Sequence, residues 1–356
     1  AVSGAPRRVV VWATGWVGTL AVRAIHERPD LELVGVWVHD PAKDGRDAGE
    51  IAGIGPIGVT ATTDRTALLD LAPDCVCYTA SGPDRDAAAI PDYEEMLARG
   101  CNVVTVSSPG LVFPPAYPTA ARDRLAAAAA AGGASLYASG IEPGFAGDQL
   151  VLTLATQSRS IRSIRTQEHF CYDRYPVTFM MFEVFGFGQP LEHTPLMSLE
   201  GAQRVAWEPP VRMVAHALGV TLDGVRETYE RRVTDRTLRV ASGVIEAGTV
   251  GAIRMETIGV VDGRDAIVIE HVNRMAPDLA PDWPSASRDG VYRIMIEGDP
   301  DITCEMAVGT GETAQDVGMI ATTSRIVNAI PFVVDAPPGL VSSLDLPLTL
   351  PRHALR

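Results

Sequence analysis

The 356-residue sequence is poor in lysine. Its single lysine is Lys43, so arginine carries nearly all of the positive charge. The formal net charge is −14 at pH 7. Nucleic-acid binding requires a basic face, because the phosphates of the nucleic acid are negatively charged. We therefore expect no nucleic-acid partner.

Long hydrophobic runs are missing as well. No apolar stretch reaches the roughly 18 residues that a membrane-spanning helix needs. The first residues, AVSGAPRR, lack the cleavable hydrophobic region of a signal peptide. Because 46% of the residues are hydrophobic, the chain can still fill the cores of two domains. We expect a soluble, cytoplasmic protein without a membrane partner.

Cysteine is scarce, with five residues at positions 75, 77, 101, 171 and 304. Cys75 and Cys77 lie in DCVCYTA, which has the pattern of a buried strand, where residues two apart share a face. Two such thiols could bind a metal, but no histidine or carboxylate cluster follows at ligand spacing. We therefore expect buried, reduced thiols and no metal site.

The first 150 residues alternate between strand and helix patterns. The strands are near-continuous apolar runs, as in a parallel sheet that helices cover on both faces. The runs are RVVVWA, LELVGVWV, IGVTAT, DCVCYTA, NVVTV and SLYASG. The sequence thus predicts an α/β fold with a doubly wound, dinucleotide-binding Rossmann domain over residues 1–150.

After this domain the pattern changes to long alternating strands, typical of a mostly antiparallel sheet. These strands are SIRSIRTQEHF, GTVGAIRMETIGVVDG, AIVIEHVNRM and VYRIMIEGD. Asp262-Gly263 and Asp289-Gly290 predict hairpin turns. We expect a second, α+β domain over residues 151–312. Residues 313–356 should form a C-terminal helix and loop that pack back on the first domain.

The first strand, turn and helix, VVVWATGWVGTLAVRAIHERPD, carry most of a dinucleotide-binding fingerprint. In G-x-G-x-x-G, the second glycine lets the pyrophosphate approach and the third lets helix and strand pack closely. Gly15 and Gly18 keep these two roles, whereas Ala13 replaces the first glycine. Alanine is tolerable there if its φ stays negative, and a purely structural turn is the competing interpretation. The expected cofactor contacts are Ala13, Thr14, Gly15, Trp16, Val17 and Gly18.

The loop after the second strand bears on the choice of nucleotide. A carboxylate at this strand end is typical of NAD sites, and Asp40 lies nearby. However, Lys43 stands where a 2′-phosphate would lie, with His39 and Arg46 beside it. We expect NADP(H), with NAD(H) or a merely solvated polar loop as alternatives. The loops after the fourth and fifth strands should frame the nicotinamide through Thr79, Ala80, Ser81, Ser107 and Ser108.

Several segments are similar to the 2,4-diaminopentanoate dehydrogenases and to their relatives, the native amine dehydrogenases. These segments are VHDPAKDGRDAGEIAG, GCNVVTV, SGIEPGFAGD, FEVFGFG and DLAPDWP, which follow in order between about Val9 and Pro347. Both families are distantly related to dihydrodipicolinate reductase, whose paired-histidine, lysine and D-A-P-S-G-T signature is not found here. The resemblance implies a Rossmann domain, a substrate domain that also builds a homodimer, and hydride transfer between NAD(P)H and a C=N carbon.

The sequence departs from this family at a functional position. In the amine dehydrogenases an acidic residue follows the NVVT strand and is implicated in ammonia addition, but Ser107 to Gly110 occupy that place here. Where the family usually has N-P-G-F, this chain has a glutamate, Glu142, before Pro143-Gly144-Phe145. We expect Glu142 to replace the missing acid in part, with first-turn helix capping as its alternative role.

The second domain supplies further candidates. His169 and Tyr172 lie in TQEHFCYDRYP, and a histidine near neutral pKa can act as acid or base. His169 could equally be a hydrogen-bonded core residue. The expected substrate contacts are Phe145, Tyr175, Phe179 and His271. No cationic cluster lies near them, which favours a small neutral ketone or amine over a dicarboxylate.

We therefore expect an NAD(P)H-dependent oxidoreductase of amine dehydrogenase type. It would reductively aminate small ketones with ammonia, or deaminate amines, through an imine. One alternative is an NADPH-dependent ketone, enone or imine reductase that does not use ammonia. Another is a non-catalytic NADPH-binding protein, while dihydrodipicolinate reductase activity is disfavoured.

Overall fold

The computed structural model describes residues 5–82, 85–309 and 314–355. The contacts between residues divide the chain into two units. Unit 1 combines residues 1–144 and 319–356, and unit 2 consists of residues 145–318. The boundaries expected at residues 150 and 312 each lie six residues from the observed ones.

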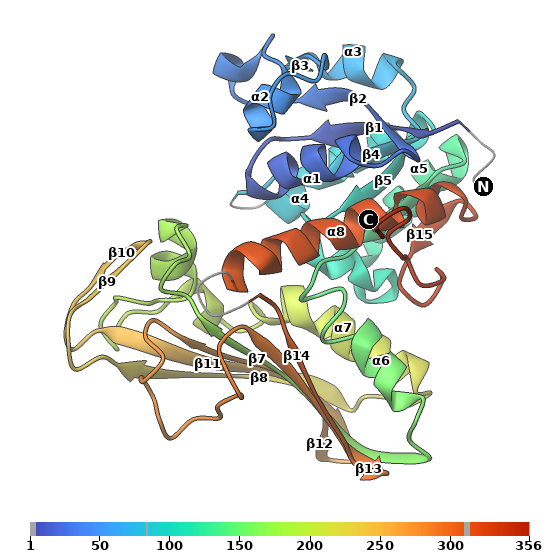
Figure 1. Cartoon of the computed structure of the whole chain (residues 1–356). Coiled ribbons are helices and arrows are strands. Elements are labelled where there is room, and N and C mark those ends of the chain that lie inside the picture. Colours follow the sequence, from blue (N-terminus) through green and yellow to red (C-terminus); the bar gives the residue numbers. More distant parts are fainter. Residues whose placement is uncertain (1–4, 83–84, 310–313, 356) are drawn as a thin grey trace. The chain divides into compact units, whose positions relative to one another are not determined.

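Unit 1 contains a seven-stranded parallel sheet in the order β15-β6-β5-β4-β1-β2-β3 (Figure 1). Its strands are β1 (Arg7–Trp12), β2 (Leu31–Trp37), β3 (Ala61–Thr62), β4 (Cys75–Tyr78), β5 (Asn102–Thr105), β6 (Ser135–Ala138) and β15 (Gly339–Val341). The first six overlap the six apolar runs, although β3 covers only the last two residues of IGVTAT, and their order is that of a doubly wound sheet. The predicted Rossmann fold is confirmed, while β15 adds an unpredicted strand from the C-terminal segment.

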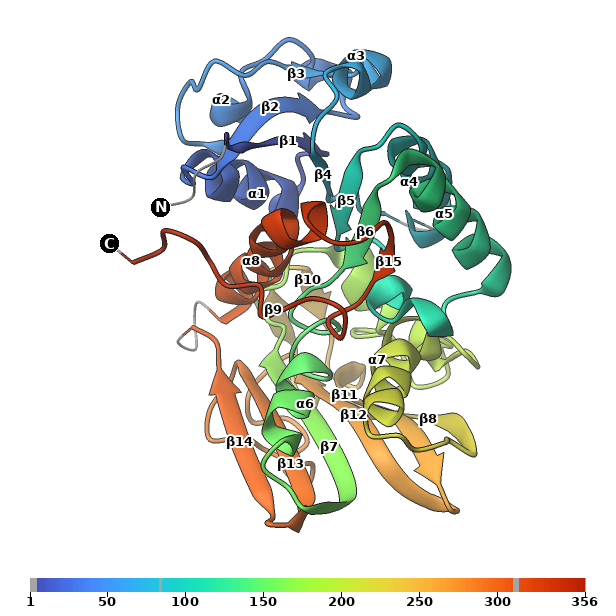
Figure 2. The ribbon, with the colours of Figure 1, turned by 90° about the vertical axis from the view of Figure 1, so that its right-hand side faces the viewer.

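Helices cover both faces of this sheet. One face carries α1 (Trp16–His26), α2 (Ala48–Ala52) and α8 (Ala314–Val334). The other carries α3 (Arg65–Asp70), α4 (Arg85–Ala98) and α5 (Thr119–Gly132), of which α4 and α5 pack side by side (Figure 2). Alternate residues of β1 serve the two cores, because successive side chains of a strand point to opposite faces. Val9 and Val11 enter one core, and Val10 and Trp12 enter the other.

The long helix α8 belongs to the first of these cores. By length and composition alone, Asp316–Val334 is apolar enough to cross a membrane, with a mean hydropathy of 1.5. Polar residues interrupt its apolar stretches, so it does not form a continuous run in the sequence. Its residues Ile326, Val327, Ile330 and Val333 are buried against the strands of unit 1. Core packing therefore accounts for the apolar residues in the second half of this helix.

The cysteines of β4 share one face, as expected. Cys75 and Cys77 are fully buried, and burial raises the pKa of the Cys77 thiol to about 12. All five cysteines are free thiols. Among the residues described, no cluster of histidine, cysteine and carboxylate side chains could hold a metal ion.

Unit 2 is built on a six-stranded sheet in the order β14-β13-β7-β12-β11-β8. Its strands are β7 (Ser160–Cys171), β8 (Gly224–Val233), β11 (Val250–Val261), β12 (Arg264–Arg274), β13 (Val291–Asp299) and β14 (Ile302–Ala307). A small hairpin pairs β9 (Leu238–Val240) with β10 (Gly243–Ile245). Only β7 and β12 run parallel within the six-stranded sheet, so the expected, mostly antiparallel arrangement is confirmed.

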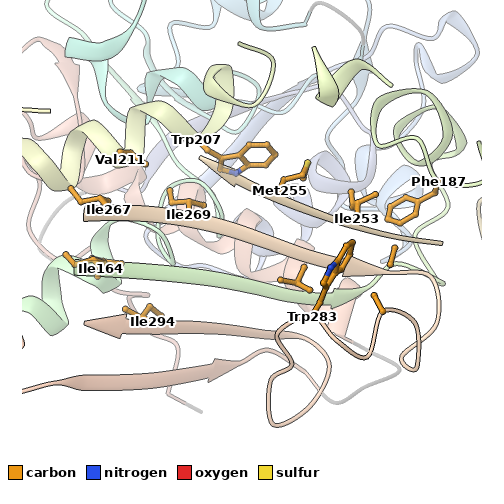
Figure 3. Packing of buried hydrophobic residues seen from close by; sticks show 14 of the residues in the cluster. Ile164, Phe187, Trp207, Val211, Ile253, Met255, Ile267, Ile269, Trp283 and Ile294 are labelled. Carbon is orange, nitrogen blue, oxygen red and sulfur yellow. The ribbon is translucent and has the colours of Figure 1, made fainter. Parts of the chain in front are cut away.

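Two helices, α6 (Gln149–Ala155) and α7 (Arg204–Ala217), pack on one face of this sheet. Figure 3 shows Trp207 and Val211 of α7 lying over Ile267 and Ile269 of β12. The core of unit 2 therefore rests on the apolar alternation that the sequence displays along β7, β11, β12 and β13.

The remaining helical segments of the two units are short. They are η1 (Pro41–Lys43), η2 (Pro109–Val112), η3 (Pro114–Ala116), η4 (Met180–Val184) and η5 (Leu196–Ser198).

The two predicted hairpin turns have different outcomes. Asp262 and Gly263 both have positive φ, 51° and 69°, and they join β11 to β12 as predicted. The prediction for Asp289-Gly290 was wrong, because this pair precedes β13, which pairs with β7 and β14. Instead, the Asp289 carboxylate accepts a hydrogen bond from the backbone N–H of Cys171 at 2.6 Å.

Candidate functional site

The nucleotide-binding turn joins β1 to the amino end of α1. Gly15 is the N-cap residue of α1, and a methyl group added there would meet no atom within 4 Å. A methyl group on Gly18 would lie 2.1 Å from the carbonyl oxygen of Ala13 and 2.8 Å from Oγ1 of Thr79. Gly15 thus leaves space for a phosphate at a helix N-terminus, and Gly18 permits close packing of helix and strand.

Ala13 differs from the expectation of a negative φ. Its φ is +85°, in the left-handed region that a side chain disfavours. The backbone N–H of Ala13 donates to the carbonyl of Trp37 at 3.0 Å, and Oγ1 of Thr79 donates to the Ala13 carbonyl at 3.2 Å. These contacts hold Ala13 in the backbone conformation that the first glycine of the fingerprint would adopt. The turn therefore keeps its shape, but the alanine is strained because its φ is positive.

Replacing Ala13 with glycine should therefore stabilise the protein. The left-handed conformation costs a residue with a Cβ about 1–2 kcal/mol, and the greater freedom of glycine in the unfolded chain offsets part of the gain. We expect the free energy of unfolding to rise by about 0.5–1 kcal/mol, measured by urea denaturation.

A matched control is Ala127→Gly on the exposed side of α5. It should lower the free energy of unfolding by about 1 kcal/mol, because glycine disfavours the helix interior. A comparable loss of stability in both variants would contradict the strained conformation of Ala13.

A cavity of about 220 Å³ lies beside this turn, between the loops that follow β1, β2 and β4. Its lining is Ala13, Thr14, Gly15, Trp37, His39, Asp40, Lys43, Thr79, Ala80, Ser81 and Arg85. The expected cofactor residues of these three loops are thus brought together, apart from Arg46, which is exposed and does not line the cavity. Trp37 and Arg85 were not predicted. The strand end at Trp37 was a usable signal, whereas nothing in the sequence singled out Arg85.

Lys43 links the second-strand loop to the phosphate-binding turn. Its ammonium Nζ donates to the carbonyl oxygen of Thr14 at 3.2 Å and to Thr14 Oγ1 at 3.1 Å. The carboxylate of Asp40 accepts the backbone N–H of Ala42 at 2.9 Å, which caps the turn η1. The carboxylate that would favour NAD therefore forms a hydrogen bond within its own loop. Lys43 and Arg85 place positive charge in the same cavity.

An aromatic stack stiffens one wall of this cavity. The ring of Trp37 stacks on Trp12 with centroids 5.0 Å apart and an interplanar angle of 15°. His39 lies 6.1 Å from Trp37 on the cavity side, and Tyr78 lies 6.3 Å from Trp12 within the core. Because stacked rings move little and present a flat surface, this wall suits a flat heterocyclic base.

A second, smaller cavity of about 80 Å³ lies at the carboxyl ends of β5 and β6. Ser108 from the β5 loop and Glu142 from the β6 loop both line it, as expected for parallel strands that end at one edge. Ser107 lies outside it. The Ser107 hydroxyl donates to the Ala80 carbonyl at 2.6 Å and so ties the β5 loop to the β4 loop.

Hydroxyl groups surround the Glu142 cavity. Ser108 is fully buried, and its Oγ lies 3.2 Å from the hydroxyl of Tyr93, which also contacts Thr105 Oγ1 at 2.9 Å. Ser139 and Thr322 complete the polar lining. A carboxylate among hydroxyl groups can accept a proton and return it, which is the chemistry of a general acid or base.

In unit 2, His169 and Tyr172 do not meet. Glu168 lies beside His271 in the register of β7 and β12. The His271 ring packs against Trp207 of α7, so Glu168 points to the helix-covered face. The hydroxyl of Tyr172 donates to Glu168 at 2.7 Å. His169 points to the opposite face, where its Nε2 lies 3.4 Å from Gln167 Oε1.

His169 also differs from the near-neutral acid or base that we expected. Burial lowers its pKa to about 4, and the charges of Arg293 and Arg274 contribute to the shift. The imidazole is therefore neutral at physiological pH, as in a packed core residue. The sequence could not show this, because the burial of His169 depends on strands that lie far away along the chain.

The expected substrate residues have varied surroundings. His271 is buried with its ring 4.3 Å from Trp207, and burial lowers its pKa. The Tyr175 ring lies 5.8 Å from that of Tyr172, whereas Phe179 is 45% exposed. The carbonyl of Phe145 accepts hydrogen bonds from the turn that leads into α6. Tyr172 and His271 are thus both neighbours of Glu168, a residue that was not among the expected site residues.

Two known families match successive segments of the chain. Residues 145–354 match the 2,4-diaminopentanoate dehydrogenase C-terminal domain. Residues 7–80 match the N-terminus of dihydrodipicolinate reductase. The second match covers β1 to β4 and therefore includes the phosphate-binding turn and the Lys43 loop.

Among solved structures, an amine dehydrogenase from Mycobacterium smegmatis has the same fold, with a TM-score of 0.76. It is 20% identical, and the similarity covers 97% of each chain. GenD2 from gentamicin A biosynthesis, in complex with NAD, matches with a TM-score of 0.52 at 16% identity, over 93% of this chain and 88% of that one. At such identities the likeness establishes the fold alone.

Sequence relatives are more informative. The 2,4-diaminopentanoate dehydrogenase of Acetoanaerobium sticklandii is 29% identical over 240 residues, which are 65% of this chain and 64% of that protein. An amine dehydrogenase of Streptomyces virginiae is 42% identical over 345 residues, which are 95% of this chain and 96% of that protein. The chain therefore belongs to the family of the amine dehydrogenases and 2,4-diaminopentanoate dehydrogenases.

Proposed function

We propose that this protein is an NAD(P)H-dependent oxidoreductase that interconverts small neutral ketones and amines through an imine. The observation that carries the proposal is the pair of cavities at the carboxyl edge of the unit 1 sheet. One cavity brings the phosphate-binding turn together with Lys43 and Trp37, which suits the phosphate and adenosine part of a dinucleotide, and the other holds Glu142. The relationship to the Streptomyces virginiae amine dehydrogenase supports the assignment.

The residues of the turn fit a dinucleotide. The open space at Gly15 and the amino end of α1 suit the pyrophosphate, and the flat wall at Trp37 suits the adenine base. The loops that carry Thr79 and Ser107 are tied together next to this turn and would frame the nicotinamide. When bound, the nicotinamide ring supplies or accepts the hydride.

Glu142 would move the protons. When ammonia adds to a ketone, a C–N bond forms, and a proton must pass from nitrogen to oxygen before water leaves and the C=N bond forms. A carboxylate can take the first proton and return it to the departing hydroxyl, whereas the serine hydroxyl at position 108 cannot act as a base unaided. Ser108, Ser139 and Thr322 would orient the carboxylate and the polar groups of the substrate.

A direct test is the oxidation of NADPH and NADH by the purified protein with small ketones, with and without ammonia. Ketone-dependent oxidation that requires ammonia, together with formation of the amine, supports the proposal. Oxidation that is independent of ammonia would identify a ketone or enone reductase instead. Tight NADPH binding without turnover of any ketone or amine would indicate a non-catalytic binding protein.

NADP(H) should be the preferred cofactor, because Lys43 and Arg85 line the cavity while the Asp40 carboxylate caps η1. A charge-assisted phosphate contact changes affinity by about 10- to 100-fold. We expect Lys43→Ala to weaken NADPH by that factor and to leave NADH nearly unchanged, as measured by fluorescence titration.

The conservative variant Lys43→Arg keeps the charge and serves as the control for the Lys43→Ala titration. It should retain most of the affinity for NADPH. If Lys43→Ala weakens NADPH and NADH equally, Lys43 acts through its bonds to Thr14 and does not read the 2′-phosphate.

The proposed enzyme would act as a homodimer in the cytoplasm. Free thiols at all five cysteines are typical of a reducing compartment. Unit 2 exposes large apolar side chains from the segment after β7 to the first turn of α7, and an interface would cover such a surface. These side chains are Val177, Phe179, Leu191, Leu196, Leu199 and Val205. Light scattering should give twice the mass of the chain, and a monomer at micromolar concentration would contradict the dimer.

A further inference from the structure

Two buried carboxylates lie on opposite faces of the paired strands β7 and β12, and they differ in their partners. Glu270 is fully buried and accepts hydrogen bonds from Arg165 Nη1 at 2.6 Å, Arg254 Nε at 2.7 Å and Gln167 Nε2 at 2.8 Å. Two arginines therefore compensate its charge. Burial alone would raise the pKa of Glu270, but Gln167 and these arginines lower it below its usual value.

Glu168, on the other face, has neutral partners only. It is 7% exposed. Its Oε1 accepts from the Tyr172 hydroxyl at 2.7 Å and from Asn273 Nδ2 at 3.1 Å, and its Oε2 accepts from the Tyr292 hydroxyl at 3.1 Å. In the part of the chain that the structure describes, no arginine, lysine or histidine forms an ion pair with Glu168.

This arrangement lacks a positive charge. A buried carboxylate is costly unless a cation pairs with it, and neutral donors solvate the charge without cancelling it. His271 is a basic neighbour on the same face, but burial lowers its pKa and keeps it neutral. A carboxylate has about four acceptor positions, so the three bonds of Glu168 leave one position, on Oε2.

The surroundings of Glu168 are aromatic. The ring of Phe170 lies 5.3 Å from Tyr292, and the ring of Tyr172 lies 5.8 Å from Tyr175 and 6.1 Å from Phe185. Aromatic faces attract organic cations, and aromatic groups beside a carboxylate are the typical receptor for an alkylammonium ion.

We infer that Glu168 binds the positively charged nitrogen of the substrate, as the ammonium of the amine or as the iminium. Tyr172, Tyr292 and Asn273 hold the carboxylate in place, and the aromatic side chains around it contact the alkyl group. This inference rests on the proposed function and assigns its amine-binding residue. Because the ketone is neutral, Glu168 should distinguish the amine from the ketone.

The test compares Glu168→Gln with the wild-type protein in both reaction directions. We expect the KM for cyclohexylamine in oxidative deamination to rise 10- to 100-fold, because one charge-assisted bond is lost. The KM for cyclohexanone in ammonia-dependent reduction should change less than about 3-fold, because a neutral ketone forms no such bond. Glu270→Gln is the matched control, since it removes the carboxylate with two arginine partners. It should lower the melting temperature and leave the KM for cyclohexylamine unchanged.

A binding measurement keeps the inference testable without turnover. With NADPH present, which cannot oxidise the amine, the wild-type protein should bind cyclohexylamine at least 10-fold more tightly than cyclohexanol, and Glu168→Gln should abolish the difference. If Glu168→Gln does not fold, Glu168→Asp keeps the charge and should keep part of the preference. The absence of a preference in the wild-type protein, or a preference that survives in Glu168→Gln, would overturn the inference. Amine turnover with an unchanged KM in Glu168→Gln would overturn it and leave the proposed function intact.

Discussion

Glu142→Gln is expected to lower the turnover of ammonia-dependent ketone reduction by about 100-fold. Glutamine keeps the size and the hydrogen-bonding capacity of the side chain but cannot accept the proton from adding ammonia. Glu142 is half-buried and lines the small cavity at the ends of β5 and β6, away from the cavity of the nucleotide turn. The affinity for NADPH should therefore be unchanged in a fluorescence titration.

Ser108→Ala provides the matched control for Glu142→Gln, because both residues line the same cavity. The loss of a hydroxyl that only orients its neighbours should lower the turnover by about 10-fold or less. The turnover of Ser108→Ala should therefore remain well above that of Glu142→Gln. If Glu142→Gln retains its turnover and loses only cofactor affinity, Glu142 holds the nicotinamide amide and is not the acid or base.

Gly18→Ala is expected to have the largest effect on stability. The added methyl group would lie 2.1 Å from the Ala13 carbonyl, a backbone atom that cannot move without opening the turn. Overpacking of this kind costs about 1–3 kcal/mol and more where backbone must shift. We expect the free energy of unfolding to fall by about 3 kcal/mol and dinucleotide binding to be lost, as measured by urea denaturation and cofactor titration.

Gly15→Ala separates the two roles of glycine in this turn. Its φ is −75° and no atom lies within 4 Å of the added methyl group, so the stability should change by less than about 0.5 kcal/mol. The methyl group would occupy the approach of the pyrophosphate, so the affinity for NADPH and NADH should fall at least about 10-fold. Equal losses of stability in Gly15→Ala and Gly18→Ala would contradict this division of roles.

The Rossmann part of the fold was predictable because its signals are local. The strands β1 to β6 lie in short apolar runs, and alternate residues such as Val9 and Val10 contribute to the cores on the two faces. Gly15 and Gly18 mark the turn by their spacing alone. The conformation of Ala13 was not predictable, because bonds to Trp37 and Thr79, distant in sequence, hold its positive φ.

Other elements were not visible in the sequence. The strand β8, GVRETYERRV, carries charges on both faces, so its pattern does not alternate between apolar and polar residues. Strand β15 has only three residues and depends on pairing with β6. The turn at Asp289-Gly290 has the composition of a hairpin, but the strand that follows it pairs elsewhere. In each case a partner distant in the sequence decides the structure.

The sequence by itself determined the nucleotide-binding turn, the two-part architecture and the placement of Ser108 and Glu142 at one edge of a parallel sheet. These features depend on local hydrophobic pattern, on turn glycines and on the direction of successive strands. Only the tertiary structure separated Glu168 from its neighbour His169 and surrounded Glu168 with Asn273 and Tyr292, which lie 105 and 124 residues away in the chain. The physical reason is that adjacent residues of a strand face opposite sides of the sheet, and the pairing of distant strands decides the surroundings of each side chain.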